Sequence, residues 1–130
     1  MSVPNTLDGF EVTAAIERML DQPMLWWQAV GLFVEHFADW ERTWLDSIGD
    51  NAREQKSVHA LRSAAANVGA MALSAVAAEL EGQLLKCLAG SEPNVPETLR
   101  DRLLVSFRQT LRVAAEAWRS GTPASGERAG

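Results

Sequence analysis

The sequence is short of several residue types, and each shortage narrows the possible functions. Its 130 residues include no tyrosine and one cysteine. That residue, Cys87, cannot form an internal disulfide, and its helical spacing from Leu84 and Leu88 favours a buried thiol over a redox role. No apolar run approaches the ~18 residues of a membrane span, and the N-terminus lacks the basic and then apolar order of a signal peptide. We therefore expect a cytoplasmic location and no contact with a membrane.

Positive charge is also scarce. Twelve lysines and arginines stand against seventeen acidic residues, which gives a net charge of -5. Binding to nucleic-acid phosphates requires a basic patch, and the scattered basic residues form none, so we expect no nucleic-acid partner. The sequence also lacks a Walker loop, a kinase-like glycine-rich loop and carboxylates spaced for magnesium. The chain alone therefore cannot activate ATP, and we expect no cofactor and no metal.

Helical periodicity dominates what is present. With 47% hydrophobic and 22% charged residues, the chain suits one domain with one core. No alternation of the strand type lasts four residues, so the expected fold is all-α. We expect a short first helix over residues 9–20 and then four helices in an antiparallel up-and-down bundle. Residues 1–8 would be an N-terminal segment, 9–120 the bundle domain and 121–130 a disordered tail.

The second helix has the strongest apolar pattern. Pro23 suits its first turn, and apolar side chains then recur at steps of three and four to the end of one continuous helix. These positions are Trp26, Val30, Phe33, Phe37, Trp40, Trp44 and Ile48. Aromatic residues at this spacing could line a cofactor pocket, but a packed core is the better interpretation.

Local signals set the limits of the last three helices. The third helix begins with Asp50 as its N-cap, or with Asn51 and Glu54 as a capping box. Gly69 and Ala70 separate it from a fourth helix, which presents Leu73, Val76, Ala77, Leu80, Leu84 and Leu88 inward. Residues 89–96 are rich in loop formers. The fifth helix presents Leu99, Leu103, Phe107, Leu111, Ala114 and Trp118 inward.

One histidine on the third helix is distinctive because of its neighbours. His59, Arg62, Ser63 and Ala66 share a helical face, whereas Val58, Leu61, Ala65 and Val68 form a separate apolar stripe. The imidazole is therefore expected on an exposed face. The small, solvent-facing side chains of Ser63 and Ala66 would leave the ring open to another protein, and Arg62 could stabilise an anion carried on it. A lone exposed histidine is otherwise most often an ordinary solvated residue.

The stretch from His59 to Ala70 resembles the signature of histidine-containing phosphotransfer (HPt) domains. That signature reads roughly His-x-Leu-Lys-Gly-Ser/Ala-Ala/Ser-x-x-Val/Leu-Gly-Ala, followed by Leu and later by Leu-Glu. It is matched by His59, Leu61, Arg62, Ala64, Ala65, Val68, Gly69, Ala70, Leu73, Leu80 and Glu81. The similarity covers roughly residues 8–88. Arg62 replaces the usual lysine, which keeps the charge but changes its shape, and Ser63 replaces the usual glycine.

The resemblance implies a phosphocarrier of a bacterial-type two-component multistep phosphorelay, not an enzyme. His59 would accept a phosphoryl group from the aspartate of a receiver domain and pass it to another receiver, which supplies magnesium. Arg62 would pair with the phosphoryl oxygens, and Lys56 would add a second charge or be an ordinary surface lysine. Asn67 would orient this face or merely end the helix, and His36, which has no such context, would be a surface residue. Family analogy favours a monomer.

Two other functions remain open from the sequence alone. A module with this fold could dock a receiver or another protein without phosphoryl transfer, and the departures at Arg62 and Ser63 favour this alternative somewhat. A helical bundle could instead serve assembly only, with the histidine incidental.

Overall fold

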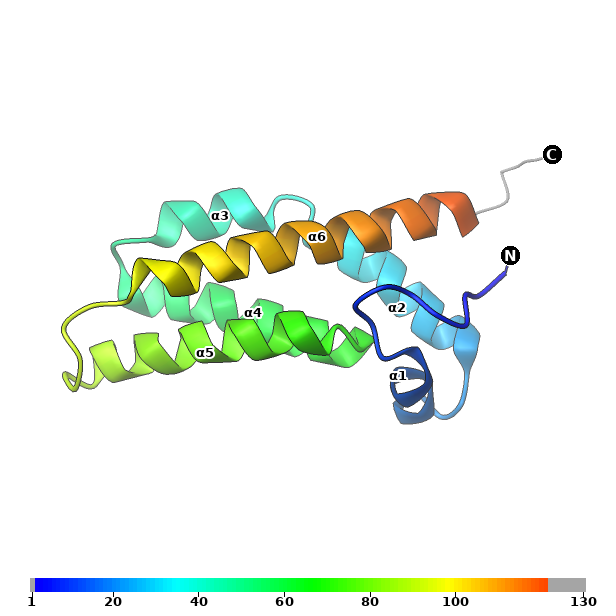
Figure 1. Cartoon of the computed structure of the whole chain (residues 1–130), viewed down its shortest axis with the longest axis horizontal. Coiled ribbons are helices and arrows are strands. Elements are labelled where there is room, and N and C mark those ends of the chain that lie inside the picture. Colours follow the sequence, from blue (N-terminus) through cyan, green and yellow to red (C-terminus); the bar gives the residue numbers. More distant parts are fainter. Residues whose placement is uncertain (1, 122–130) are drawn as a thin grey trace.

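The computed structural model describes residues 2–121, and this part of the chain is a bundle of α-helices (Figure 1). The only β-type pairing within it is an isolated bridge between Leu7 and Phe10. The helices are α1 (Val12–Arg18), α2 (Pro23–His36), α3 (Trp40–Ser47), α4 (Asn51–Val68), α5 (Met71–Leu88) and α6 (Glu97–Gly121). Three sides of the bundle are α4, α5 and α6, and α2 with α3 forms the fourth, each antiparallel to the next (Figure 1). The predicted all-α bundle with a short N-terminal helix is confirmed.

The prediction of one continuous second helix is wrong. The chain leaves the helix after His36 and resumes it at Trp40, which separates α2 from α3. The indole of Trp40 donates to the carbonyl of Ser57 on α4 at 3.0 Å, and its ring stacks on Trp44 at 5.1 Å between centroids. The hydrogen bond fastens the start of α3 to α4, and the stack stiffens α3 itself. A step of three from Phe37 to Trp40 suits a straight helix equally well, so the apolar spacing alone could not reveal the break.

The core lies between the helices, as the apolar stripes predict. All four members of the stripe on α4 are buried, and the largest fully buried side chains include Trp26, Trp27, Trp44 and Phe107. Two predicted inward positions are wrong, because Ile48 and Leu88 are exposed. Each follows or ends the last turn of a helix, where neighbouring helices no longer cover it. Cys87 lies beside Leu88 in the last turn of α5, and this residue, predicted to be buried, is only partly so.

The ends of α4 are fixed by its own sequence. Asp50 accepts a hydrogen bond from the backbone N–H of Arg53 at 3.2 Å, so Asp50 is the N-cap. Gly69 ends the helix with φ of 89°, a left-handed conformation that glycine adopts without strain. A Cβ at this position would lie 2.9 Å from the carbonyl oxygen of Glu11, so the approach of the N-terminal segment also requires glycine. This turn brings α5 back along α4.

A buried ion pair links α4 to α6 across the bundle. Glu54 is fully buried, and its carboxylate accepts hydrogen bonds from Arg100 at 2.8 and 2.9 Å and from the indole of Trp44 at 3.0 Å. Three donors compensate the carboxylate for the loss of water. Glu54 therefore does not take part in a capping box with Asn51, and that alternative is wrong.

The last helix extends slightly further than expected. Gly121, the first residue of the predicted tail, belongs to α6, and the rest of that prediction lies outside the described residues. Within residues 2–121, no helix combines the length and the apolar character needed to span a membrane.

Candidate functional site

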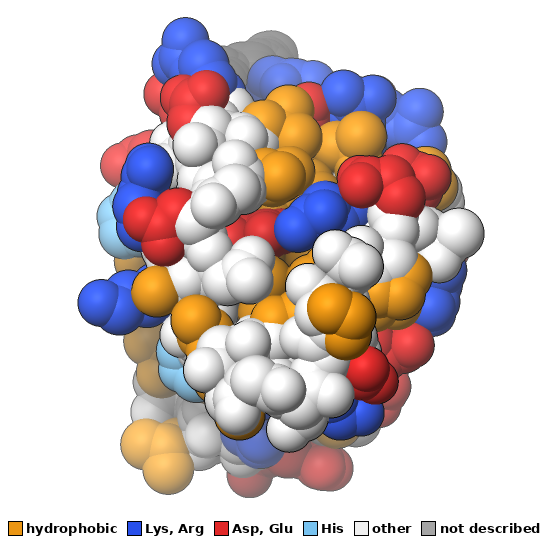
Figure 2. Space-filling view, turned by 90° about the vertical axis from the view of Figure 1, so that its left-hand side faces the viewer, with side chains coloured by type: hydrophobic (Ala, Val, Ile, Leu, Met, Phe, Trp, Pro, Cys, Tyr) orange, Lys and Arg blue, Asp and Glu red, His pale blue; other side chains and the backbone are white. Residues whose placement is uncertain are grey.

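His59 lies in the middle of α4 with its ring on the solvent side. Its neighbours Val58 and Leu61 are fully buried and anchor this part of the helix in the core. The His59 side chain is 51% exposed, and Ser63, one turn further on, is also exposed. The predicted accessible imidazole is therefore present. In Figure 2, which shows the bundle from the end that carries the loops before α4 and before α6, histidine side chains lie at the left-hand edge. They belong to a long side of the bundle and not to its end.

Glu81 of α5 holds the ring from the other side. The side chain of Glu81 is only 8% exposed, and its Oε2 lies 2.8 Å from Nδ1 of His59. The same carboxylate accepts hydrogen bonds from Arg62 Nε at 2.6 Å and from Gln55 Nε2 at 2.7 Å. These four residues form one hydrogen-bonded group across two helices, which we call the His59 cluster. Just below it, the Ser74 hydroxyl donates to the Arg62 carbonyl at 3.1 Å and fixes α5 against α4.

The carboxylate at the centre of the cluster is ionised. Burial by itself raises the pKa of Glu81, but hydrogen bonds from Gln55, Arg62 and His59, together with the charge of Arg62, outweigh that effect. The resulting pKa of Glu81 lies below its ordinary value of 4.5. Glu81 is therefore negatively charged at neutral pH and can only accept hydrogen bonds.

An ionised Glu81 determines which nitrogen of the neutral ring carries the proton. Because the carboxylate only accepts, Nδ1 of His59 must donate to it. Arg62 Nη2 also lies 3.0 Å from Nδ1, but a guanidinium only donates, so this approach is a close contact and not a hydrogen bond. The proton on Nδ1 leaves Nε2 with a free lone pair. Within residues 2–121, Nε2 has no hydrogen-bond partner. The cluster thus presents a nucleophilic nitrogen on an exposed ring.

The predicted basic residues occupy different positions. Arg62 is 37% exposed, and its Nε is engaged with Glu81 while the end of its guanidinium lies beside the ring. Lys56 is exposed one turn before His59, and it forms no ion pair within the described part of the chain. The contact of Arg62 with a phosphoryl group and the role of Lys56 both stay predictions.

The expectation that Ala66 faces solvent is wrong. Ala66 is half-buried, and its carbonyl accepts a hydrogen bond at 2.8 Å from Arg18 of α1, which packs over this end of α4. Asn67 is exposed and lines a hollow of about 180 Å³ between α2 and α4, which His36 and Phe37 also line. Gly69, and not Asn67, ends the helix. Neither Ala66 nor Asn67 contacts the His59 cluster through a hydrogen bond.

Two members of the cluster were not assigned a role from the sequence. Glu81 lies at a helical spacing from Ala77 and Leu84, which places a carboxylate on the buried stripe of α5. A carboxylate at such a position requires a partner, and this signal could have identified it. Gln55 lies one turn before His59, so its proximity follows from helical spacing, but its hydrogen bond to Glu81 depends on how α4 and α5 pack.

Comparison with known proteins identifies one similar family. The family model described as the Hpt domain matches residues 32–120. The matched span runs from the second half of α2 almost to the end of α6 and includes the whole His59 cluster. Neither a curated protein nor a solved structure shows a significant match to the chain.

Proposed function

Since the chain belongs to the Hpt domain family, we propose that it carries a phosphoryl group on Nε2 of His59 between two receiver domains of a phosphorelay. Hpt domains are phosphocarriers that act in phosphorelays with receiver domains, and they are not enzymes. The observation that supports His59 as the carrier is the hydrogen bond from its Nδ1 to Glu81, which leaves Nε2 free on an exposed ring.

In the proposed transfer, the Nε2 lone pair attacks the phosphorus of the receiver's aspartyl phosphate. An N–P bond forms while the P–O bond to the aspartate breaks, and the electron pair of that bond returns to the aspartate carboxylate. No proton has to leave Nε2. Because Nδ1 keeps its proton, the ring becomes positively charged, and the Glu81 carboxylate at 2.8 Å stabilises this charge. The reverse reaction delivers the phosphoryl group to the second receiver.

Arg62 contributes in two ways in this proposal. Its Nε–H donates to Oε1 of Glu81, which leaves Oε2 to accept from the ring and from Gln55. The Arg62 side chain is 37% exposed and its Nη2 lies beside the ring, so the guanidinium would pair with phosphoryl oxygens. Lys56, exposed one turn earlier, would add a second positive charge to the same face.

The surface beside His59 suits a receiver that approaches over α4. Ser63 is exposed and small, so it leaves room for the partner. Next to it, the hollow between α2 and α4 is lined by apolar residues that include Leu32 and Ala64, and Leu32 is exposed. A partly apolar surface next to a charged site is typical of a protein interface.

Incubation with a phosphorylated receiver tests the proposal. The wild-type chain should acquire acid-labile label, and His59→Gln should acquire none while keeping its helical circular dichroism and thermal unfolding. His36→Gln is the matched control, because His36 is the other histidine of the chain and is also exposed. It should be labelled like the wild type. Label on His59→Gln would show that His59 is not the carrier.

The same experiment distinguishes the alternative of a receiver-binding adaptor. If the wild-type chain binds the receiver stably but never acquires label, the chain docks the receiver without transfer. The assignment of a free Nε2 nucleophile would then be wrong.

A further inference from the structure

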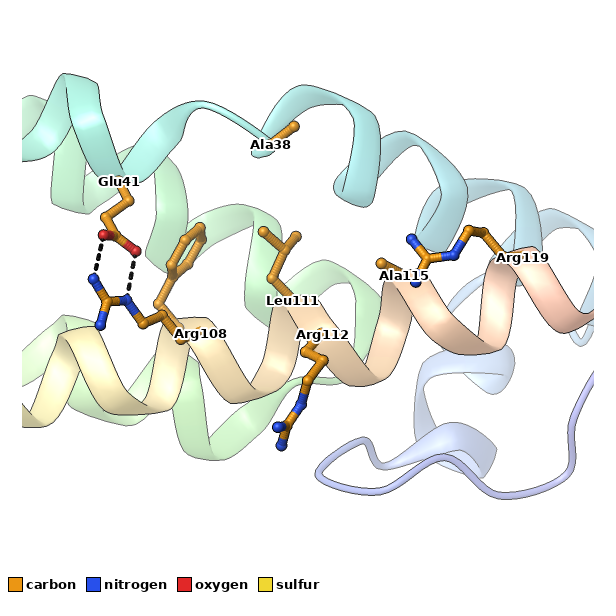
Figure 3. A pocket seen from close by; sticks show the side chains of 8 residues that line it. Ala38, Glu41, Arg108, Leu111, Arg112, Ala115 and Arg119 are labelled. Atoms are coloured by element: carbon orange, nitrogen blue, oxygen red, sulfur yellow. Dashed lines mark hydrogen bonds and ion pairs between the residues drawn. The ribbon is translucent and has the colours of Figure 1, made fainter.

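A second surface lies between α6 and the break that separates α2 from α3 (Figure 3). It contains a hollow of about 330 Å³ with an apolar floor formed by Ala38, Phe107, Leu111 and Ala115. The hollow owes its space to the break, because Ala38 is part of the link between α2 and α3 and contributes only a methyl group. Its rim is formed by Glu41, Arg108, Arg112 and Arg119.

The charged side chains on this rim differ in whether they are paired. Glu41 and Arg108 satisfy one another through two hydrogen bonds of 2.9 and 2.7 Å (Figure 3). Arg112 and Arg119 form no hydrogen bond or ion pair through their side chains within residues 2–121. Figure 3 shows Arg119 extending over the gap towards α2 and Arg112 extending away from α3. Two guanidiniums that have no partner in the described part of the chain therefore line the hollow.

The basic character of this side of α6 contrasts with the whole chain. From Val105 to Gly121 the sequence has three arginines and one acidic residue, Glu116, although the net charge of the chain is -5. The three arginines are spaced by four and seven residues, so they follow one side of the helix. We call Arg108, Arg112 and Arg119 the arginine strip. A second hollow of about 310 Å³ lies beside it, lined by Arg108, Gln109, Arg112 and the 67% exposed Val105.

We propose that the arginine strip and its apolar floor bind an acidic amphipathic segment of a protein partner. Arg108 and Arg119 are eleven positions apart, roughly 16 Å along the helix at about 1.5 Å per residue, so a small anion could contact only one end of the strip. A segment with carboxylates spaced one and two turns apart could pair with Arg112 and Arg119 together. An apolar side chain of the same segment would fill the hollow above Leu111 and Ala115.

This surface is separate from the His59 cluster. The strip lies on α6, where Arg108 pairs with Glu41 of α3, whereas His59 lies on α4 and is held by α5. In the bundle α6 packs on α5 and α2, diagonally across from α4. A receiver at His59 would leave the strip accessible, so both partners could bind at once. The inference thus goes beyond the proposed function.

The test uses a synthetic helical peptide with glutamates flanking a stripe of leucines, labelled with fluorescein. Fluorescence anisotropy should show binding to the full chain, and a matched peptide with glutamine for glutamate should bind at least about tenfold more weakly. The double substitution Arg112→Glu/Arg119→Glu should weaken binding of the acidic peptide by about tenfold or more. Arg53→Glu, a charge reversal at an exposed position of α4, should leave the affinity unchanged.

The apolar floor has its own test. Ala115→Trp would fill the hollow with an indole, and it should weaken peptide binding while thermal unfolding changes little. Amide chemical shifts in ¹⁵N-labelled chain should move along α6 and around residues 37–41 on addition of the peptide. Shifts centred on α4 would overturn the proposal. Equal binding by the charge-reversed and wild-type chains would also overturn it.

Two other occupants of the surface give distinct results. If sedimentation shows a dimer that Arg112→Glu/Arg119→Glu dissociates, the strip is an interface between copies of this chain and the proposal is wrong. If the chain binds phosphatidylserine vesicles and not the peptide, the strip is a lipid-binding surface and the proposal is again wrong. Labelling of His59 by a receiver should be the same in all these variants, so a failure here is distinguishable from a failure of the proposed function.

Discussion

At the scale of single residues, the site depends on the Glu81 carboxylate, whose role is hard to recognise from the sequence. His59 and Arg62 could be selected from the sequence because they lie one turn apart on one helix. Glu81 lies 22 residues away from His59, and its hydrogen bond to the ring exists only because Gly69 turns α5 back along α4. Helical spacing predicts neighbours within a helix, and pairing between helices depends on their packing. The exposed histidine was therefore predictable, whereas the orientation of its ring was not.

The role of Glu81 leads to a prediction about the His59 tautomer. In the wild type, ¹⁵N shifts of the imidazole should show mainly the form with the proton on Nδ1. Glu81→Gln offers the ring both a donor and an acceptor, so the form with the proton on Nε2 should increase and the rate of phosphoryl transfer should fall. Glu79→Gln is the control, because Glu79 lies on the same helix and pairs with Arg102, away from His59. A wild-type ring protonated mainly on Nε2 would contradict the assignment.

The same substitution should change how stability depends on pH. The folded state lowers the pKa of Glu81 below 4.5, so its ionisation stabilises the fold above that value. This contribution is lost as the pH falls through the lowered pKa. Glu81→Gln lacks the titrating group, so its free energy of unfolding should fall less steeply with acid than that of the wild type. Urea unfolding at several pH values measures the difference.

At the scale of helices, local chemistry predicted some boundaries and packing decided others. Asp50 as a cap, Gly69 and Ala70 as the separation between two helices, and a loop over residues 89–96 are predicted from local signals, and the structure confirms each. The break between α2 and α3 has no such signal, because residues 37–39 contain neither glycine nor proline. The break lies where the indoles of Trp40 and Trp44 on α3 donate hydrogen bonds to α4. The periodicity of the sequence could therefore predict the apolar stripe, but it could not predict that this stripe is divided between α2 and α3.

The exposed side of α4 gives a prediction about docking. Ser63 is exposed one turn after His59, so Ser63→Trp should block the receiver by steric exclusion while thermal unfolding stays nearly unchanged. Ala66→Trp is not an equivalent test, since Ala66 is half-buried beneath α1. Ser120→Trp, the same change at an exposed position of α6, is the matched control and should be labelled normally. Full receiver affinity and normal labelling of Ser63→Trp would mean that the receiver approaches over another face.

At the scale of the whole molecule, ion pairs of similar geometry join the helices both in the interior of the bundle and on its surface. The carboxylate of Glu54 joins three helices from inside, with Trp44 on α3 and Arg100 on α6 as its donors. The pair between Glu79 and Arg102 has nearly the same two-bond geometry, at 2.9 and 3.1 Å, but lies at the surface between α5 and α6. Because Glu54 is fully buried whereas both members of the second pair are half exposed, the two pairs should differ greatly in their effect on stability.

This contrast can be measured by substituting one arginine at a time. Arg100→Ala leaves the buried Glu54 carboxylate with Trp44 as its only donor, and it should lower the free energy of unfolding by about 3–5 kcal/mol. Arg102→Ala should have a small effect, because both members of that pair remain accessible to water. Replacing both partners, as in Glu54→Leu/Arg100→Met, removes the unpaired charge and should restore much of the loss. Urea unfolding of these variants gives the comparison. If Arg100→Ala is no more destabilising than Arg102→Ala, the buried pair does not hold α4 and α6 together, and the packing of the apolar stripes alone fixes the helix that carries His59.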